Sequence, residues 1–113
     1  MGFSLLAAFG MTGVAERWFR FLVRRAPEDR ASLHAELAEV YERAGNKELA
    51  RSNYEEAIRL APGDGYYRIL LGSLLEQIGA RDEAVEQYRS GLALPHGLSA
   101  EYVAAIEHKI SAG

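Results

Sequence analysis

The sequence predicts an all-α protein, and three of its features carry that prediction. Apolar residues recur with helical spacing, as in Leu33, Leu37, Val40 and Tyr41, which follow the i, i+4, i+7, i+8 pattern of one buried helix face. No segment sustains the alternation of apolar and polar residues that marks a strand. Each of the three prolines ends a helical stretch, because proline lacks the backbone N–H and its ring clashes with the preceding turn.

Glycines and capping residues then place the ends of the individual helices. Gly45 and Gly79 are expected at helix C-termini, where a left-handed residue is needed, and Gly10 occupies a similar place. Asn46, Asp64 and Ser99 are expected N-caps, because each precedes a helical run. The helices that follow from these signals are 3–10, 13–26, 30–44, 47–61, 65–79, 82–94 and 99–111. Pairs with favourable i, i+4 orientation are expected at Glu16–Arg20, Glu39–Arg43 and Glu55–Arg59.

One part of the sequence returns after 34 residues. The string AGNKELARSNYEEAIRLAP at 44–62 is followed by GARDEAVEQYRSGLALP at 79–95. The same offset separates Gly45 from Gly79, Ala50 from Ala84, Tyr54 from Tyr88, Ile58 from Leu92 and Leu60 from Leu94. A constant offset at so many positions indicates a repeated structural unit.

The unit 31–64 resembles the tetratricopeptide repeat, a 34-residue helix–turn–helix unit. The places that carry the resemblance hold His34, Leu37, Ala38, Tyr41, Gly45, Ala50, Tyr54, Ala57 and Pro62, of which His34 is the loose match. The unit 65–97 matches at Leu71, Gly72, Gly79, Ala84 and Tyr88. It departs from the family pattern with Arg68, Leu75 and Gly91, and with Pro95, which comes one residue early.

The resemblance implies an all-α solenoid formed by one domain over residues 1–113. Residues 1–27 are expected to be a truncated repeat, in which Leu6, Gly10, Ala15 and Phe19 take the repeat positions, and residues 98–113 a capping helix. Small residues let the two helices of a hairpin approach closely, and tyrosines fill the remaining spaces. A single hairpin cannot bury its own apolar face, so about three stacked units are needed.

Composition and charge exclude several classes of function. The sequence has no cysteine, and His34, His96 and His108 are too far apart to share a metal ion, so we expect no metal and no cofactor. No nucleophile or phosphate-binding motif is present, and we expect no catalytic residue. The net charge of −3 argues against nucleic acid. The apolar run at 1–15 is too short to cross a bilayer and lacks a basic start, so we expect a cytoplasmic protein.

By the resemblance, the protein is a non-catalytic interaction module that holds a peptide or helix of a partner in its concave groove. The groove positions are Ser32, Ala35, Glu39, Glu42, Tyr66, Ile69, Ser73 and Glu76. They lack the Lys, Asn and Arg clamp of the chaperone-binding members. The glutamates predict a basic partner, and Tyr66 and Ile69 are the expected apolar anchor. The alternative is that this face is merely solvated and the domain is one piece of a scaffold.

The N-terminal part of the sequence predicts a second surface. Residues 1–27 have a net charge of +3, whereas the remaining 86 residues have −6. The helix at 13–26 is apolar over so much of its circumference that self-association into a homo-oligomer is the alternative function. The expected residues of that surface are Phe9, Arg17, Trp18, Arg20, Phe21 and Leu22. A membrane-apposed role, or one as an enzyme accessory, is a weaker alternative.

Overall fold

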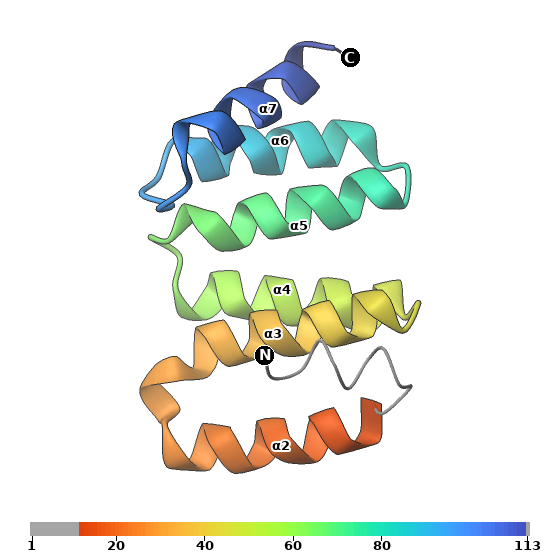
Figure 1. Cartoon of the computed structure of the whole chain (residues 1–113), viewed down its shortest axis with the longest axis vertical. Helices are drawn as coiled ribbons and strands as arrows, with labels where there is room; N and C mark the ends of the chain where they lie inside the picture. The colour runs from red at the N-terminus through yellow and green to blue at the C-terminus, as the bar shows by residue number, and fades with distance from the viewer. Residues whose placement is uncertain (1–11, 113) are drawn as a thin grey trace. The chain divides into compact units, whose positions relative to one another are not determined.

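The computed structural model describes residues 12–112, and every regular element within them is helical. The helices are α2 (Thr12–Arg25), α3 (Arg30–Arg43), α4 (Lys47–Leu60), α5 (Gly65–Gln77), α6 (Arg81–Leu92) and α7 (Ala100–Ser111), with a short 3₁₀ turn η1 (Pro27–Asp29) before α3 (Figure 1). The all-α prediction is confirmed, and each described helix lies within two residues of its predicted bounds. The predicted helix 3–10 and Gly10 lie outside the described residues.

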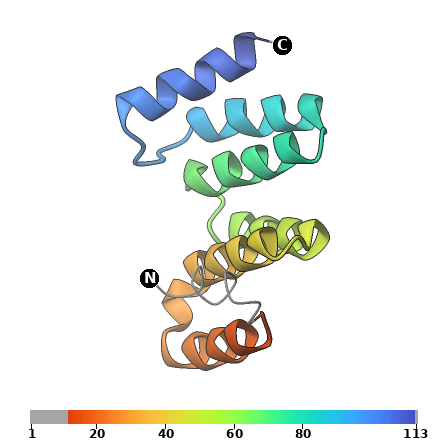
Figure 2. The same cartoon turned by 45° about the vertical axis from the view of Figure 1, so that its right-hand side comes forward.

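The chain divides into two compact units at residues 61 and 62, three residues before the predicted boundary between the two full repeats. In the first unit, α3 and α4 form a hairpin and α2 packs against α3. In the second unit, α5 and α6 form the equivalent hairpin, and α7 lies on α6 (Figure 2). Each unit therefore contains one helical hairpin and one additional helix.

The two hairpins close with the same turn. Gly45 and Gly79 have φ angles of 86° and 83°, the left-handed conformation that glycine adopts without steric cost. The amide after each glycine donates to a carbonyl five residues earlier, from Asn46 to Tyr41 at 2.8 Å and from Ala80 to Leu75 at 2.9 Å. These are the bonds of a Schellman motif, so both predicted C-terminal glycines are confirmed.

The N-termini of α4, α5 and α7 are capped by the predicted residues. The side chains of Asn46, Asp64 and Ser99 accept hydrogen bonds from the backbone N–H groups of Leu49, Tyr66 and Tyr102, respectively. These bonds satisfy N–H groups that have no partner within the helix. All three predicted N-caps are confirmed.

Small residues let the helices of each hairpin approach closely. Ala38, Ala50 and Ala57 are fully buried in the first hairpin. In the second, a methyl group on Gly72 would lie 2.8 Å from the Tyr88 ring, so glycine provides the space that the ring occupies. The predicted role of the small positions is therefore the observed one.

Gly91, which departs from the family pattern, stands at the closest approach of α5 and α6. A methyl group there would lie 2.8 Å from the carbonyl oxygen of Gly65, and one on Gly65 would lie 2.0 Å from the carbonyl oxygen of Gly91. The amide of Gly65 also donates to the carbonyl of Pro95 at 2.8 Å. Helix α6 ends at Leu92, three residues before Pro95, and the proline prevents its continuation because it disfavours helical geometry at Leu94.

Candidate functional site

The eight predicted groove residues lie on α3 and α5, the first helices of the two hairpins. Ser32 and Tyr66 are exposed, and Tyr66 retains 40 % of its accessible surface. The remaining polar members, Glu39, Glu42, Ser73 and Glu76, are half-buried. Each hairpin thus presents one exposed residue in the first turn of the helix and half-buried polar residues farther along it.

Two of the eight residues are buried, and one of them is Ile69, which was predicted as part of an accessible apolar anchor. Ile69 is only 1 % exposed and Ala35 only 8 %. Ile69 packs beside Gly91, where the missing side chain leaves the space that the isoleucine fills. Spacing within α5 did not reveal this inward orientation, because it depends on a glycine in α6. Tyr66 is the apolar side chain of this set that remains accessible.

A tyrosine on the second helix of each hairpin donates a hydrogen bond to a glutamate on the first. The hydroxyl of Tyr54 donates to Oε1 of Glu42 at 2.8 Å, and that of Tyr88 donates to Oε1 of Glu76 at 2.6 Å. Donor and acceptor each recur after 34 residues, so the bond is a repeated feature. It fixes the position of one carboxylate at the same place in both hairpins.

Glu76 has a second partner, on the last helix. The ammonium of Lys109 lies 3.2 Å from Oε1 of Glu76, and Arg81 donates to the backbone carbonyl of Lys109 at 2.5 Å. The hydrogen bond from Tyr88, aided by that from Lys109, lowers the pKa of Glu76 against the opposing effect of burial. Burial, reinforced by the hydrogen bond to Glu76, raises the pKa of Tyr88. At neutral pH the pair is therefore a neutral phenol and a carboxylate.

The observed surface ion pairs agree only in part with those predicted from the sequence. The Glu39–Arg43 pair is confirmed at 3.1 Å. The predicted Glu55–Arg59 pair is wrong, because Arg59 pairs with Glu56 one turn back and Glu55 pairs with Arg51. Several neighbouring carboxylates compete for each guanidinium on an exposed helix, and spacing alone does not select among them.

Glu16 likewise makes a different contact from the expected bond to Arg20. Its carboxylate accepts a hydrogen bond from the hydroxyl of Tyr41, so the contact joins α2 to α3. Burial and this bond raise the pKa of Tyr41 to about 12. Helix α2 is therefore tied to α3 by a polar contact as well as by packing.

The histidines do not form a site. His34 shares a hydrogen bond of 2.9 Å with Asn53, and the Phe19 ring packs edge-on against it with the ring centroids 4.7 Å apart. His34 is a packing residue, as its repeat position implies. Within residues 12–112, no three His, Asp or Glu side chains gather in a way that could hold a metal ion.

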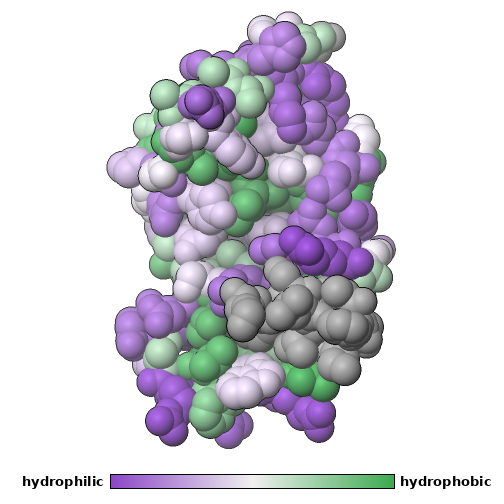
Figure 3. Space-filling model, viewed as in Figure 1, coloured by the Kyte–Doolittle hydropathy of each residue, from purple (hydrophilic) through white to green (hydrophobic). Residues whose placement is uncertain are grey.

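The predicted N-terminal surface is partly exposed. Trp18 and Phe21 each keep 48 % of their accessible surface, Arg17 and Arg20 are exposed, and Leu22 is half-buried. Trp18 and Phe21 pack edge-to-face with centroids 5.5 Å apart, beside a shallow hollow of about 360 Å³. Figure 3 shows hydrophobic and strongly hydrophilic residues side by side over α2, at the foot of the view. Phe9 lies outside the described residues.

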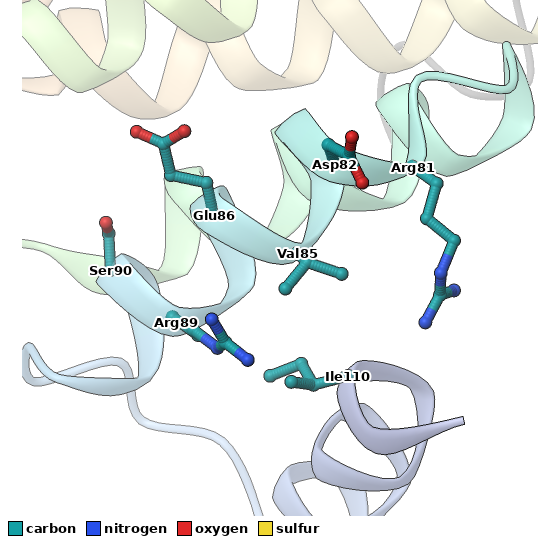
Figure 4. A pocket seen from close by; sticks show the side chains of 7 residues that line it. All are labelled: Arg81, Asp82, Val85, Glu86, Arg89, Ser90 and Ile110. Carbon is teal, nitrogen blue, oxygen red and sulfur yellow. The ribbon is translucent and has the colours of Figure 1, made fainter. Parts of the chain in front are cut away.

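A wider hollow of about 680 Å³ lies along α6 in the second unit. Arg81, Val85 and Arg89 are on the side of α6 that faces Ile110 of α7, whereas Glu86 and Ser90 point to the other side (Figure 4). The hollow carries charges of both signs and has no nucleophile paired with a base. It was not predicted, because it depends on how α7 lies on α6.

Comparison with known proteins adds one match. The model of the tetratricopeptide repeat family matches residues 31–64, which span α3, the turn at Gly45 and α4. No curated protein sequence matches the chain. None of the helices within residues 12–112 combines the length and the apolar character required to span a membrane.

Proposed function

Because residues 31–64 match the tetratricopeptide repeat, a unit that generally mediates contacts between proteins, we propose that this protein is a non-catalytic interaction module. Its ligand is a peptide or helix of a partner protein, held by the first-helix faces of the hairpins. In the family's arrays these faces line the concave groove.

The observation that supports this proposal most directly is the repeated hydrogen bond between tyrosine and glutamate. Tyr54 and Tyr88 hold Glu42 and Glu76 at equivalent places of two helices. A fixed carboxylate loses less side-chain entropy on binding than a mobile one, so it is a better partner for a cation.

The chemistry of this face favours a basic segment with an apolar side chain. Glu39 and Glu42 provide two carboxylates on α3, which speed encounter with basic segments and reject acidic ones, whereas Glu76 already pairs with Lys109. Tyr66 provides an exposed aromatic ring of the type that anchors interfaces. Because Ile69 and Ala35 are buried, the apolar contribution of this face rests on Tyr66.

The test is titration of the full chain with a labelled peptide that carries lysines and a leucine. Glu39→Lys combined with Glu42→Gln should weaken binding about tenfold, given that each exposed charge pair contributes about 0.2–1 kcal/mol and a reversed charge repels. The amide oxygen of the new glutamine can still accept the hydrogen bond from Tyr54, which preserves the fold. Glu48→Lys with Glu55→Gln makes the same charge change on α4 and is the matched control. Equal effects of the two double variants would refute the proposal.

A further inference from the structure

The exposed face of α2 has the pattern of a helix-binding surface. Val14, Trp18, Phe21 and Arg25 follow an i, i+4, i+7, i+11 spacing, so they form one stripe along the helix. The hollow of about 360 Å³ is lined by the first three of these residues and by Arg17. The guanidinium of Arg25 lies 5.5 Å from the centroid of the Phe21 ring, within the range of a cation–π contact.

Contacts on the opposite side of α2 fix this orientation. Ala15 is fully buried, Phe19 packs on His34, and Glu16 accepts the hydrogen bond from Tyr41. The side of α2 that meets α3 is therefore occupied, and the stripe containing Trp18 points away from it.

The charge of this face is strongly positive. Helix α2 carries Arg17, Arg20, Arg24 and Arg25, and its single acidic residue is Glu16, whose carboxylate already accepts the Tyr41 hydroxyl. Arg17 and Arg24 are exposed and lie seven residues apart on one flank of the stripe, about 10 Å along the helix axis. The exposed aromatic rings therefore stand beside a row of cations.

We propose that the α2 face, formed by Val14, Arg17, Trp18, Phe21, Arg24 and Arg25, docks an acidic amphipathic helix of a partner protein. The apolar side chains of that helix enter the hollow at Trp18 and Phe21. Two of its carboxylates, placed two turns apart, pair with Arg17 and Arg24. Tryptophan and arginine are the residue types that most often carry the binding energy of an interface.

The same charges disfavour a two-fold contact between two copies of the chain. In such an interface the same patch lies on both sides, so the arginines of the two copies would face one another. Like charges brought together in an interface cost several kcal/mol. An acidic partner removes this repulsion, which is why we choose it over the self-association expected from the apolar residues alone.

Trp18 provides the measurement, because it is the only tryptophan in the sequence. The probe is a helical peptide with leucines at i, i+4 and i+7 and glutamates flanking them; its counterpart carries lysines instead. Binding of the acidic peptide should shift the Trp18 emission to shorter wavelength and should weaken as salt rises, since salt screens surface charges. The basic counterpart should leave the emission unchanged.

Variants separate this face from the rest of the molecule. Arg17→Glu with Arg24→Glu should weaken binding of a labelled acidic peptide on the order of tenfold. Trp18→Ala should weaken it on the order of 30-fold, as expected for an anchor residue. Arg30→Glu with Arg89→Glu, a reversal of two exposed arginines outside α2, is the matched control and should change little. Circular dichroism of each variant is the check that it folds.

Four outcomes would overturn the proposal. The first is an unchanged affinity for the acidic peptide in the Arg17/Arg24 variant, and the second is a Trp18 emission that already indicates a buried indole in the free protein. The third is a dimer, detected by light scattering, that Trp18→Glu dissociates. The fourth is that the protein binds vesicles of phosphatidylserine and phosphatidylcholine but not the acidic peptide. Glu39 and Glu42 lie on α3, so their variants should leave binding at the α2 face intact. Failure of one proposal is therefore distinguishable from failure of the other.

Discussion

Replacing Tyr88 with phenylalanine tests the hydrogen bond that recurs in the two hairpins. The ring still fills the space beside Gly72, so the change removes only the hydroxyl that donates to Glu76 at 2.6 Å. Hydrogen bonds to charged groups contribute about 1.5–3 kcal/mol to stability. Because Lys109 still pairs with Glu76 in the variant, we expect the lower end, a loss of about 1.5 kcal/mol.

The assay is urea unfolding followed by far-ultraviolet circular dichroism. A double-mutant cycle of Tyr88→Phe with Glu76→Gln isolates the coupling between the two side chains. Tyr102→Phe is the control, since this tyrosine is 49 % exposed and its loss of a hydroxyl should cost little. A coupling energy below about 0.5 kcal/mol at neutral pH would refute the reasoning, because a bond to a charged acceptor must exceed that value.

The pH dependence of the same bond provides a second check. The pKa of Glu76 is lower in the folded chain than in the unfolded one. Its contribution to stability is therefore fully present above the unfolded pKa of about 4.3 and is lost as the pH falls through the folded pKa. The difference in stability between wild type and Tyr88→Phe should accordingly shrink on acidification. A difference that stays constant down to about pH 2 would show that Glu76 is not the acceptor that matters.

Three further predictions concern packing, capping and alkaline pH. Gly91→Ala should lower the free energy of unfolding, measured by thermal unfolding, by about 1–3 kcal/mol because the new methyl group overpacks the contact between α5 and α6. Gly63→Ala is the control, since a methyl group at Gly63 meets open space and should not lower stability in this way. Ser99→Ala should cost about 1 kcal/mol and speed hydrogen exchange of the Tyr102 amide, which Ser99 now caps. The pKa of Tyr41 is raised to about 12, so the contribution of this group to stability is present below about pH 10 and is lost as the pH rises through about 12. The check is to measure phenolate absorbance and the free energy of unfolding over the same pH range.

The sequence predicted the features that depend on local chemistry. Helix bounds, the three N-caps and the Schellman turns at Gly45 and Gly79 are each determined by a few neighbouring residues, and the structure confirms them. The Tyr54–Glu42 and Tyr88–Glu76 bonds were missed although a signal was present. Both donor and acceptor recur at the 34-residue offset, and their coincidence within the hairpin could have suggested a contact.

Other features depend on how helices pack and could not be read from spacing. Ile69 occupies a position that is a groove position in the family, but the absence of a side chain at Gly91 turns it into a core residue. The contact between Lys109 and Glu76 joins residues 33 apart, and it depends on how α7 packs on α6. The sequence analysis therefore predicted that Glu76 is available to a ligand and did not reveal its pairing with Lys109.

The contact between Gly65 and Gly91 means that the two hairpins are not interchangeable parts. Ala31 and Ala57 take the same two positions in the first hairpin, where their methyl groups are accommodated. Replacing both Gly65 and Gly91 with the alanines of the first hairpin would put methyl groups where two backbones already touch. Such a chain would have to spread α5 from α6, and with them the loop that leads to α7. The repeat therefore specifies the type of unit, and this pair of glycines specifies its place in the chain.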